Sequence, residues 1–252
     1  MRLKALALVG LLVAPLLLAT TAVRAETVSL AVAANFADAA KAIGEAFKAK
    51  TGNDVTISSG ATGALYTQTS QGAPFEVFLA ADSKTPKKAI TEQHAVDGTD
   101  FTYAVGKLVL FSADPALVKD GDTLKTGTFQ KIAIADPKTA PYGAAAIEAM
   151  KKLGVYDALE PKLVTGTSIA QAYQFVDSKN AELGFVALSQ VVNRKDGSRW
   201  LVPQEDYAPI TQDAVLLTPG KDSAAAKDFL AYLRGDEAVT IIKSFGYEAG
   251  AK

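Results

Sequence analysis

The chain has 252 residues, of which 49% are hydrophobic and 21% charged, so it can bury a sizeable core. It contains no cysteine, which excludes thiol catalysis, disulfides, iron–sulfur clusters and thiolate metal sites. The near balance of 26 basic and 27 acidic residues argues against nucleic acid or an anionic membrane surface as a partner.

The first 25 residues have the pattern of a secretory signal peptide. Arg2 and Lys4 precede an apolar core at 6–18, and small residues up to Ala25 offer a cleavage point. The apolar core is short for a membrane span, which needs roughly 20 residues, so we expect export with cleavage near Ala25 rather than an anchor. Cleavage removes three basic residues and leaves 23 basic and 27 acidic ones, a net charge of −4. An anion site must therefore rely on local donors.

Beyond the signal peptide, apolar runs of strand length alternate with helical patterns. This alternation predicts an α/β fold built from mostly parallel sheets flanked by helices. The predicted strands are 27–33, 55–58, 77–81, 107–112, 131–135, 162–164, 183–187 and 214–217. The predicted helices are 36–50, 63–71, 84–91, 143–153, 169–176, 223–234 and 236–245.

Two stretches have the character of crossings between lobes. Residues 101–112 form a long β-like run without a break, and residues 203–218 are extended and contain proline. Two crossings imply a chain that leaves one lobe, builds a second and returns. After the signal at 1–25, we therefore expect lobe 1 at 26–105 plus 213–252 and lobe 2 at 106–212.

Four strand-to-helix junctions carry small or polar residues. The first ends at Asn35, a preferred N-cap, and the second contains Thr62, a hydroxyl that can cap the next helix, between Gly60 and Gly63. The third extends over 132–143 and the fourth over 163–169. For a single junction, capping of the helix is the ordinary explanation.

The four junctions taken together predict more than capping. In α/β sheets, ligands bind at the carboxyl ends of strands, and two junctions fall in each predicted lobe. Two lobes that close face to face would direct four helix N-termini at one cleft. Helix N-termini offer N–H donors and a partial positive charge, which suits a small, fully ionised oxyanion.

Other functions find weaker support. The G-x-G-x-x-G and Walker patterns of nucleotide binding are absent. A serine hydrolase needs a base, but the single histidine, His94, lies in a polar stretch, and neither G-x-S-x-G nor S-x-x-K occurs. A hydrolytic enzyme stays a remote alternative. The acidic pairs at 205–206 and 236–237 fit solvated surfaces, Trp200 fits packing in a loop-like stretch, and the scattered tyrosines do not favour a ferric-ion site.

Six segments in fixed order and spacing form a more specific signature. They are AANF at 33–36, SGATGALY at 59–66, GAPFEVFLAAD at 72–82, YAVGKLVL at 103–110, IADP and PYG within 134–143, and LGFVALS at 183–189. By these segments, the chain resembles the periplasmic molybdate-binding proteins of molybdate ABC transporters over essentially all of residues 26–252.

The resemblance implies a two-lobe type II periplasmic binding protein that holds molybdate or tungstate by hydrogen bonds in the cleft between its lobes. The implied ligand residues are Asn35, through its backbone N–H and side chain, with Ala34 beside it, then Thr62, Tyr142 and Ile169. It also implies a periplasmic, monomeric binding protein without catalytic residues or cofactors, which delivers its ligand to an inner-membrane ABC permease. Another tetrahedral oxyanion such as sulfate is the alternative ligand.

One position departs from the family pattern. Some members place a tyrosine hydroxyl on the oxyanion where this chain has Ala187, which cannot supply that bond. Asn35 likewise stands where many members have serine. Phosphate carries a proton at neutral pH and needs an acceptor, and the junctions offer no obvious carboxylate except the nearby Asp136. The sequence therefore disfavours phosphate.

Overall fold

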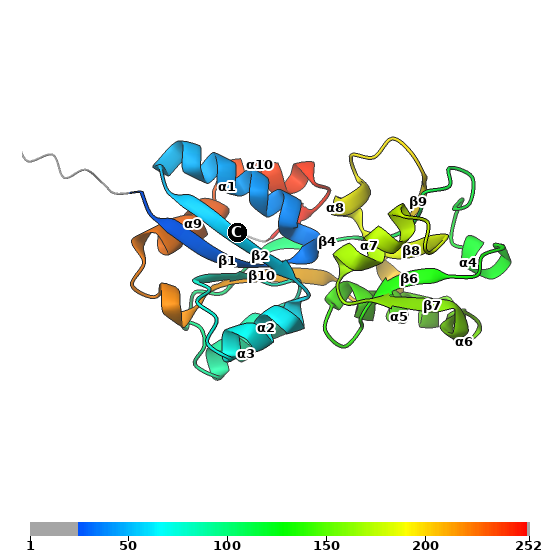
Figure 1. Ribbon diagram of the computed structural model, residues 1–252, viewed down its shortest axis with the longest axis horizontal. Helices are drawn as coiled ribbons and strands as arrows, with labels where there is room; N and C mark the ends of the chain where they lie inside the picture. The colour runs from blue at the N-terminus through cyan, green and yellow to red at the C-terminus, as the bar shows by residue number, and fades with distance from the viewer. Residues whose placement is uncertain (1–24, 251–252) are drawn as a thin grey trace, which may run out of the picture.

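Two β-sheets, each flanked by helices, define two lobes in the computed structural model, which describes residues 25–250 (Figure 1). Lobe 1 holds a six-stranded sheet of order β11-β4-β10-β3-β1-β2, and lobe 2 a five-stranded sheet of order β7-β6-β8-β5-β9. The predicted signal peptide lies outside the described residues except for Ala25. Within residues 25–250, no helix combines the length and apolar character needed to cross a membrane.

The elements of lobe 1 come from both ends of the chain. They are β1 (Thr27–Ala33), η1 (Ala34–Phe36), α1 (Ala37–Thr51), β2 (Asp54–Gly60), α2 (Thr62–Ser70), β3 (Val77–Leu79), α3 (Lys84–Thr91), β4 (Phe101–Gly106), β10 (Ile210–Leu216), η4 (Thr218–Gly220), α9 (Ala224–Leu233), α10 (Asp236–Ser244) and β11 (Glu248–Ala249).

The elements of lobe 2 are contributed by the middle of the chain. They are β5 (Leu108–Ser112), α4 (Thr123–Thr126), β6 (Ile132–Ala135), α5 (Pro141–Lys152), α6 (Tyr156–Leu159), η2 (Glu160–Lys162), β7 (Leu163–Gly166), α7 (Ile169–Asp177), β8 (Leu183–Ala187), α8 (Leu188–Val191), β9 (Ser198–Leu201) and η3 (Gln204–Asp206).

The two-lobe α/β fold matches the expectation, but the sheets are mixed rather than mostly parallel. In lobe 1, β1 pairs with β2 and β3 in parallel, whereas β10 is antiparallel to both β3 and β4. In lobe 2, β6 is parallel to β7 and β8, whereas β5 is antiparallel to β8 and β9. The antiparallel strands are those nearest the crossings, where the chain enters one lobe as it leaves the other.

The prediction of one uninterrupted β-like run over 101–112 is wrong at one residue. Lys107 separates β4, which belongs to the lobe 1 sheet, from β5, which belongs to the lobe 2 sheet. The second crossing passes from β9 through η3 into β10, which begins at Ile210 rather than near residue 214. Each break falls where the chain changes sheets, because a strand cannot keep one hydrogen-bonding partner across two lobes.

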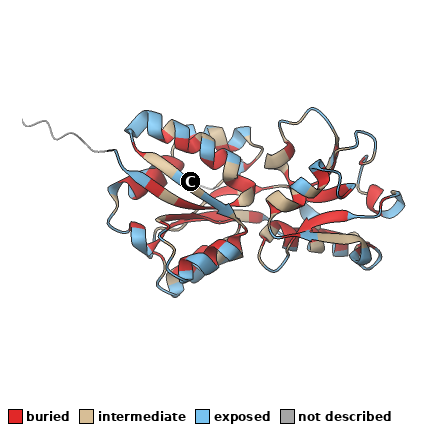
Figure 2. Cartoon of the chain, in the orientation of Figure 1, coloured by how far each residue is buried: buried red, intermediate tan, exposed pale blue. Residues whose placement is uncertain are grey.

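Apolar strands are covered on both faces, which explains their continuous hydrophobic runs. Along β1, Val28, Leu30 and Val32 pack under α1, α9 and α10, whereas Ala31 faces the cluster beneath α2 and α3. Figure 2 shows the same buried interior in each lobe.

The strand registers bring the four junctions together in pairs. Ala33 at the end of β1 lies opposite Gly60 at the end of β2. In lobe 2, Ala135 at the end of β6 lies opposite Gly166 at the end of β7. Neighbouring parallel strands thus end level with each other, so in each lobe two helices begin at the same edge of the sheet.

Candidate functional site

A small cavity lies between the lobes where these strands end. Its empty volume is about 200 Å³, and both lobes contribute to its wall. All five residues singled out from the sequence line it: Ala34, Asn35, Thr62, Tyr142 and Ile169. The remaining lining residues are Ala33, Gly60, Ala61, Ala81, Ala140 and Pro141. The fold therefore gathers all four junctions around one cavity.

The first junction differs from the expected cap. Ala33 and Phe36 are the N-cap residues of η1 and α1, and neither helix has a side-chain cap. The buried Asn35 amide instead donates one hydrogen to Gln212 Oε1 at 2.8 Å and the other to the Tyr247 hydroxyl at 3.0 Å. Both amide hydrogens are thus used inside the protein. The N-cap prediction for Asn35 is wrong because Asn35 lies within η1 and caps neither helix.

The second junction presents a hydroxyl donor. Ala61 is the N-cap of α2, so Thr62 does not cap that helix with its side chain. Thr62 Oγ1 accepts the N–H of Ala81 at 3.0 Å, which leaves the hydroxyl hydrogen to donate elsewhere. Gly63 does not line the small cavity, and its N–H donates across the lobes to the Thr139 carbonyl at 2.9 Å.

At the third junction, Pro141 and Tyr142 begin α5 directly after the buried Ala140. The helix starts close against β6, since a Cβ at Gly143 would lie 2.2 Å from the Ala135 carbonyl oxygen. Only glycine permits this approach, which holds the N-terminus of α5 at the cavity.

At the fourth junction, Ser168 caps α7 by accepting the N–H of Gln171, the one side-chain cap among the helices that border the cavity. The Gln190 side chain holds the next residue in place: its Nε2 donates to the Ile169 carbonyl and its Oε1 accepts the Ala187 N–H. Ala187 itself does not line the cavity. Side-chain capping therefore accounts for one junction and does not explain the polar residues of the others.

The cavity wall offers neutral donors. The N–H groups of Thr62, Tyr142 and Ile169 lie in the first turns of their helices, where no intrahelical acceptor reaches them. The lining residues include no charged side chain. Asp136, the acid closest in sequence, accepts the Lys138 N–H at 2.9 Å and is not part of the wall. An acceptor-rich anion is the ligand that suits such a wall.

Three buried tyrosines surround the site without supplying charge. Burial raises the pKa of Tyr103, Tyr142 and Tyr247 well above the ordinary value for a phenol, so their hydroxyls stay protonated at neutral pH. They act as hydrogen-bonding groups only. Within residues 25–250, no cluster of three or more His, Asp or Glu side chains is placed to hold a metal cation.

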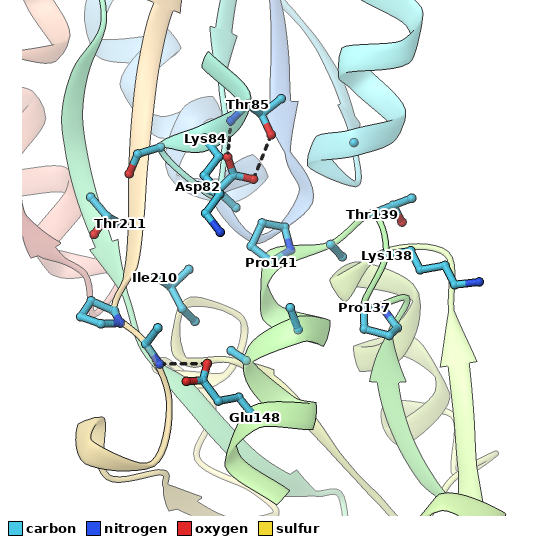
Figure 3. A pocket seen from close by; sticks show the side chains of 18 residues that line it. Asp82, Lys84, Thr85, Pro137, Lys138, Thr139, Pro141, Glu148, Ile210 and Thr211 are labelled. Atoms are coloured by element: carbon cyan, nitrogen blue, oxygen red, sulfur yellow. Dashed lines mark hydrogen bonds between the residues drawn. The ribbon is translucent and has the colours of Figure 1, made fainter. Parts of the chain in front are cut away.

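A larger cleft, with an empty volume of about 1110 Å³ by the same measure, adjoins the small cavity and shares Ala81, Ala140 and Pro141 with it (Figure 3). Its acids are engaged: Asp82 accepts from the N–H and hydroxyl of Thr85, and Glu148 accepts the Ala208 N–H. Lys84 and Lys138 lie on opposite sides of this cleft, from lobe 1 and lobe 2.

Sequence reasoning missed the polar residues behind the cavity. Gln212, Tyr247 and Ser189 contact Asn35, yet none adjoins a predicted junction. The available signal was the polar pair Gln212 and Asp213 directly before the apolar run at 214–217. Both residues are buried in β10, and Gln212 is fully buried.

The other residues weighed from the sequence lie away from the cavity. The His94 ring packs edge-on against Tyr66. Trp200 packs against the lobe 2 core as expected, but from strand β9 rather than a loop. The acidic pairs occupy η3 and the first turn of α10.

Two lobes that enclose a cavity of neutral donors define a solute-binding protein rather than an enzyme. The model of the bacterial extracellular solute-binding protein family matches residues 28–248, and the chain belongs to that family. It is 62% identical to the molybdate-binding protein ModA of Rhodobacter capsulatus, with 86% of each chain covered. It is 55% identical to ModA of Azotobacter vinelandii, over 90% of this chain and 91% of that one.

The comparison with solved structures agrees. The periplasmic molybdate-binding protein of Azotobacter vinelandii superposes with a TM-score of 0.85 and 39% identity, covering 88% of this chain and 98% of that one. The expected two-lobe type II fold is thereby confirmed.

Proposed function

We propose that the chain captures molybdate, with tungstate as a second ligand, and delivers it to an ABC importer in the inner membrane. The observation that carries this proposal is the cavity wall, in which four helix starts from two lobes meet without a charged side chain. The names of the close relatives support the choice of ligand.

In this proposal, the oxyanion accepts the backbone N–H groups of Asn35, Thr62, Tyr142 and Ile169 and the Thr62 hydroxyl, with Ala34 in contact. Asn35 contributes its backbone, since its amide hydrogens bind Gln212 and Tyr247. The dianion is stabilised by donors alone, because hydrogen bonds to a charged group are stronger than neutral ones.

The proposed wall discriminates among tetrahedral anions by two mechanisms. Phosphate keeps a proton at neutral pH, and no lining side chain is a carboxylate that could accept it. Sulfate matches molybdate in charge but is smaller, so fixed donors would be left partly unpaired, at a cost of roughly 1–3 kcal/mol per buried group.

We further propose that residues 26–106 with 210–250, and residues 108–201, move as the two bodies of a hinge; the expected lobe bounds shift by a few residues because β4 ends at Gly106 and β10 begins at Ile210. The crossings at Lys107 and at 202–209 would absorb the motion. The closed, liganded form of an exported monomer would then be the form that the inner-membrane permease recognises.

Calorimetry of the mature chain with molybdate, tungstate, sulfate and phosphate tests the proposed ligand. We expect molybdate and tungstate to bind at least about 100-fold more tightly than sulfate, and phosphate not to bind measurably; a difference of 100-fold corresponds to about 2.7 kcal/mol. Tighter binding of sulfate than of molybdate would make the chain a sulfate-type binding protein instead.

A further inference from the structure

Gln212 lies behind the cavity and contacts residues that line it. Its side chain is fully buried in β10, at the point where the chain has returned from lobe 2 to lobe 1. The ladder between β10 and β4 shifts register between Gln212 and Asp213. A buried amide costs free energy unless both its oxygen and its nitrogen find partners, so its contacts indicate what it does there.

The two ends of this amide contact residues of different lobes. Gln212 Oε1 accepts the Asn35 side-chain N–H at 2.8 Å, and Asn35 belongs to lobe 1. Gln212 Nε2 donates to the Tyr142 hydroxyl at 3.4 Å, and Tyr142 belongs to lobe 2. Both partners line the small cavity. One side chain therefore joins a cavity residue of each lobe from behind.

The first crossing leaves room for this contact. A Cβ at Gly106, the last residue of β4, would lie 2.0 Å from the Tyr142 hydroxyl and 2.6 Å from Gln212 Nε2. Any other residue at position 106 would displace both groups. The glycine in one crossing and the glutamine in the other thus form one arrangement at the hinge.

A second set of bonds holds the backbone of Asn35. Its carbonyl accepts the Ser189 hydroxyl of lobe 2 at 2.8 Å and the Tyr247 hydroxyl of lobe 1 at 2.6 Å. The Asn35 peptide is fixed from both lobes, and its orientation depends on their relative position.

We propose that Gln212 is a positioning residue that couples closure of the lobes to retention of the oxyanion. This inference rests on the proposed function. The amide fixes Asn35 and Tyr142 relative to each other, so their N–H groups converge on the ligand when the lobes are together. Opening the lobes breaks the bond to Tyr142. The bond therefore slows release of the ligand and leaves its first encounter unchanged, because encounter precedes closure.

The test compares dissociation of radiolabelled molybdate, chased with unlabelled molybdate, in four forms of the mature chain. They are the wild type, Gln212→Met, Tyr142→Phe and the double variant. Gln212→Met keeps the length of the side chain and removes its bonds to Asn35, Tyr142 and Tyr103. Tyr142→Phe removes the hydroxyl and keeps the backbone N–H.

The matched control is Tyr103→Phe. The Tyr103 hydroxyl also contacts Gln212 Oε1, at 3.2 Å, and the Ala80 carbonyl at 3.0 Å, but all of these groups belong to lobe 1. Its loss perturbs the same buried network without removing a bond between lobes. A purely structural role of the network would make Tyr103→Phe and Tyr142→Phe equivalent.

We expect Gln212→Met to release molybdate about tenfold faster and Tyr142→Phe severalfold faster, as the loss of hydrogen bonds of ordinary strength predicts. The association rate constants should stay at the wild-type value, and the double variant should release no faster than Gln212→Met. Tyr103→Phe should release at the wild-type rate.

Wild-type release from Gln212→Met, or equal release from Tyr103→Phe and Tyr142→Phe, would overturn the coupling role while the wild type still binds. A wild-type chain that does not bind molybdate contradicts the proposed function and this inference together. If Gln212→Met does not fold, the comparison of the two phenylalanine variants decides.

Discussion

At the scale of single residues, Thr62 is the side chain whose role in binding the ligand can be tested most directly. It is buried, its oxygen accepts the Ala81 N–H, and its hydrogen remains for the cavity. Thr62→Val keeps the shape and removes both functions. We expect calorimetry to show molybdate affinity lower by about 10- to 100-fold, since a hydrogen bond to a charged group is worth about 1.5–3 kcal/mol.

Two further variants separate this effect from general damage to α2. Thr62→Ser retains the hydroxyl and should bind within a few-fold of the wild type. Thr67→Val removes a hydroxyl from the exposed side of the same helix, where it bonds the Gly63 carbonyl. Equal losses of affinity in Thr62→Val and Thr67→Val would show that Thr62 does not act on the ligand.

Sequence reasoning identified which residues meet at the cavity but not what each side chain does. Thr62 and Tyr142 could be placed because each lies in a strand-to-helix junction, and the family resemblance then singled out these positions within the junctions. The side chain of Asn35 could not, because its partners Gln212 and Tyr247 lie 177 and 212 positions away. Local preference indicated an N-cap, whereas a long-range network determines the outcome.

At the scale of elements, the start of α2 acts as a contact between lobes. The Gly63 N–H donates to Thr139, and a Cβ at position 63 would lie 3.2 Å from Thr139 Cα and 3.3 Å from its carbonyl oxygen. Gly63→Ala should therefore keep the lobes slightly apart and weaken molybdate binding severalfold. The melting temperature of the ligand-free chain should not fall, because alanine favours a helix more than glycine does.

Calorimetry and thermal unfolding on the same samples check both parts of this expectation. Ala64→Ser, at the exposed next position of α2, is the control and should leave the affinity unchanged. Unchanged affinity in Gly63→Ala would mean that the two lobes tolerate the added methyl group and that the contact at Thr139 is not limiting.

Asp213 in β10 gives a pH dependence of stability. Burial raises its pKa above the ordinary 3.8, although the Thr102 hydroxyl, which donates at 2.7 Å, opposes the shift. The folded state then binds a proton more tightly than the unfolded state, so ionising Asp213 costs stability as the pH rises from about 4 through the raised pKa. The free-energy cost of ionising Asp213 is complete above the raised pKa and absent below about pH 4.

Asp213→Asn removes this cost and can still accept the Thr102 hydroxyl. We expect the variant to melt at a higher temperature than the wild type at pH 7, with the difference shrinking as the pH falls through the raised pKa toward about 4. Thermal unfolding across this range measures it. A difference that does not change with pH would show that the carboxylate is not strained by burial.

The elements themselves were predictable where local patterns are strong. Helix α3 occupies 84–91 as expected, and β1 occupies 27–33. The prediction failed where tertiary context decides. Strand β9, which carries Trp200, is an edge strand held by β5, and β11 has only two residues that pair with β4. Such short strands form because a neighbouring strand is already in place.

At the scale of the whole molecule, charge opposes the proposed ligand. The chain without its first 25 residues carries a net charge of −4, so its overall field does not attract a dianion. The cavity wall contains no cation to offset this. A local positive field along the approach would raise the rate of encounter, and the larger cleft beside the cavity carries Lys84 and Lys138.

These lysines come from opposite lobes and both line the larger cleft, with the Lys138 side chain extending outward from its rim (Figure 3). Within residues 25–250, neither lysine forms an ion pair, so no direct partner neutralises its charge. The carboxylates of Asp82 and Glu148 also line the cleft and oppose the lysines, so the variant below measures the net effect of the two lysines on an approaching anion. Because neither lines the small cavity, they should affect entry rather than retention.

The double variant Lys84→Gln/Lys138→Gln should bind molybdate severalfold more slowly at low ionic strength and dissociate at the wild-type rate. The difference should vanish near 1 M salt, where the Debye length falls to about 3 Å. Rapid-mixing measurements of association with radiolabelled molybdate at several salt concentrations test this. Lys227→Gln/Lys243→Gln, on the exposed sides of α9 and α10, changes the net charge equally and should slow association much less. Equal slowing in both double variants would mean that net charge, rather than the cleft between the lobes, governs how the anion arrives.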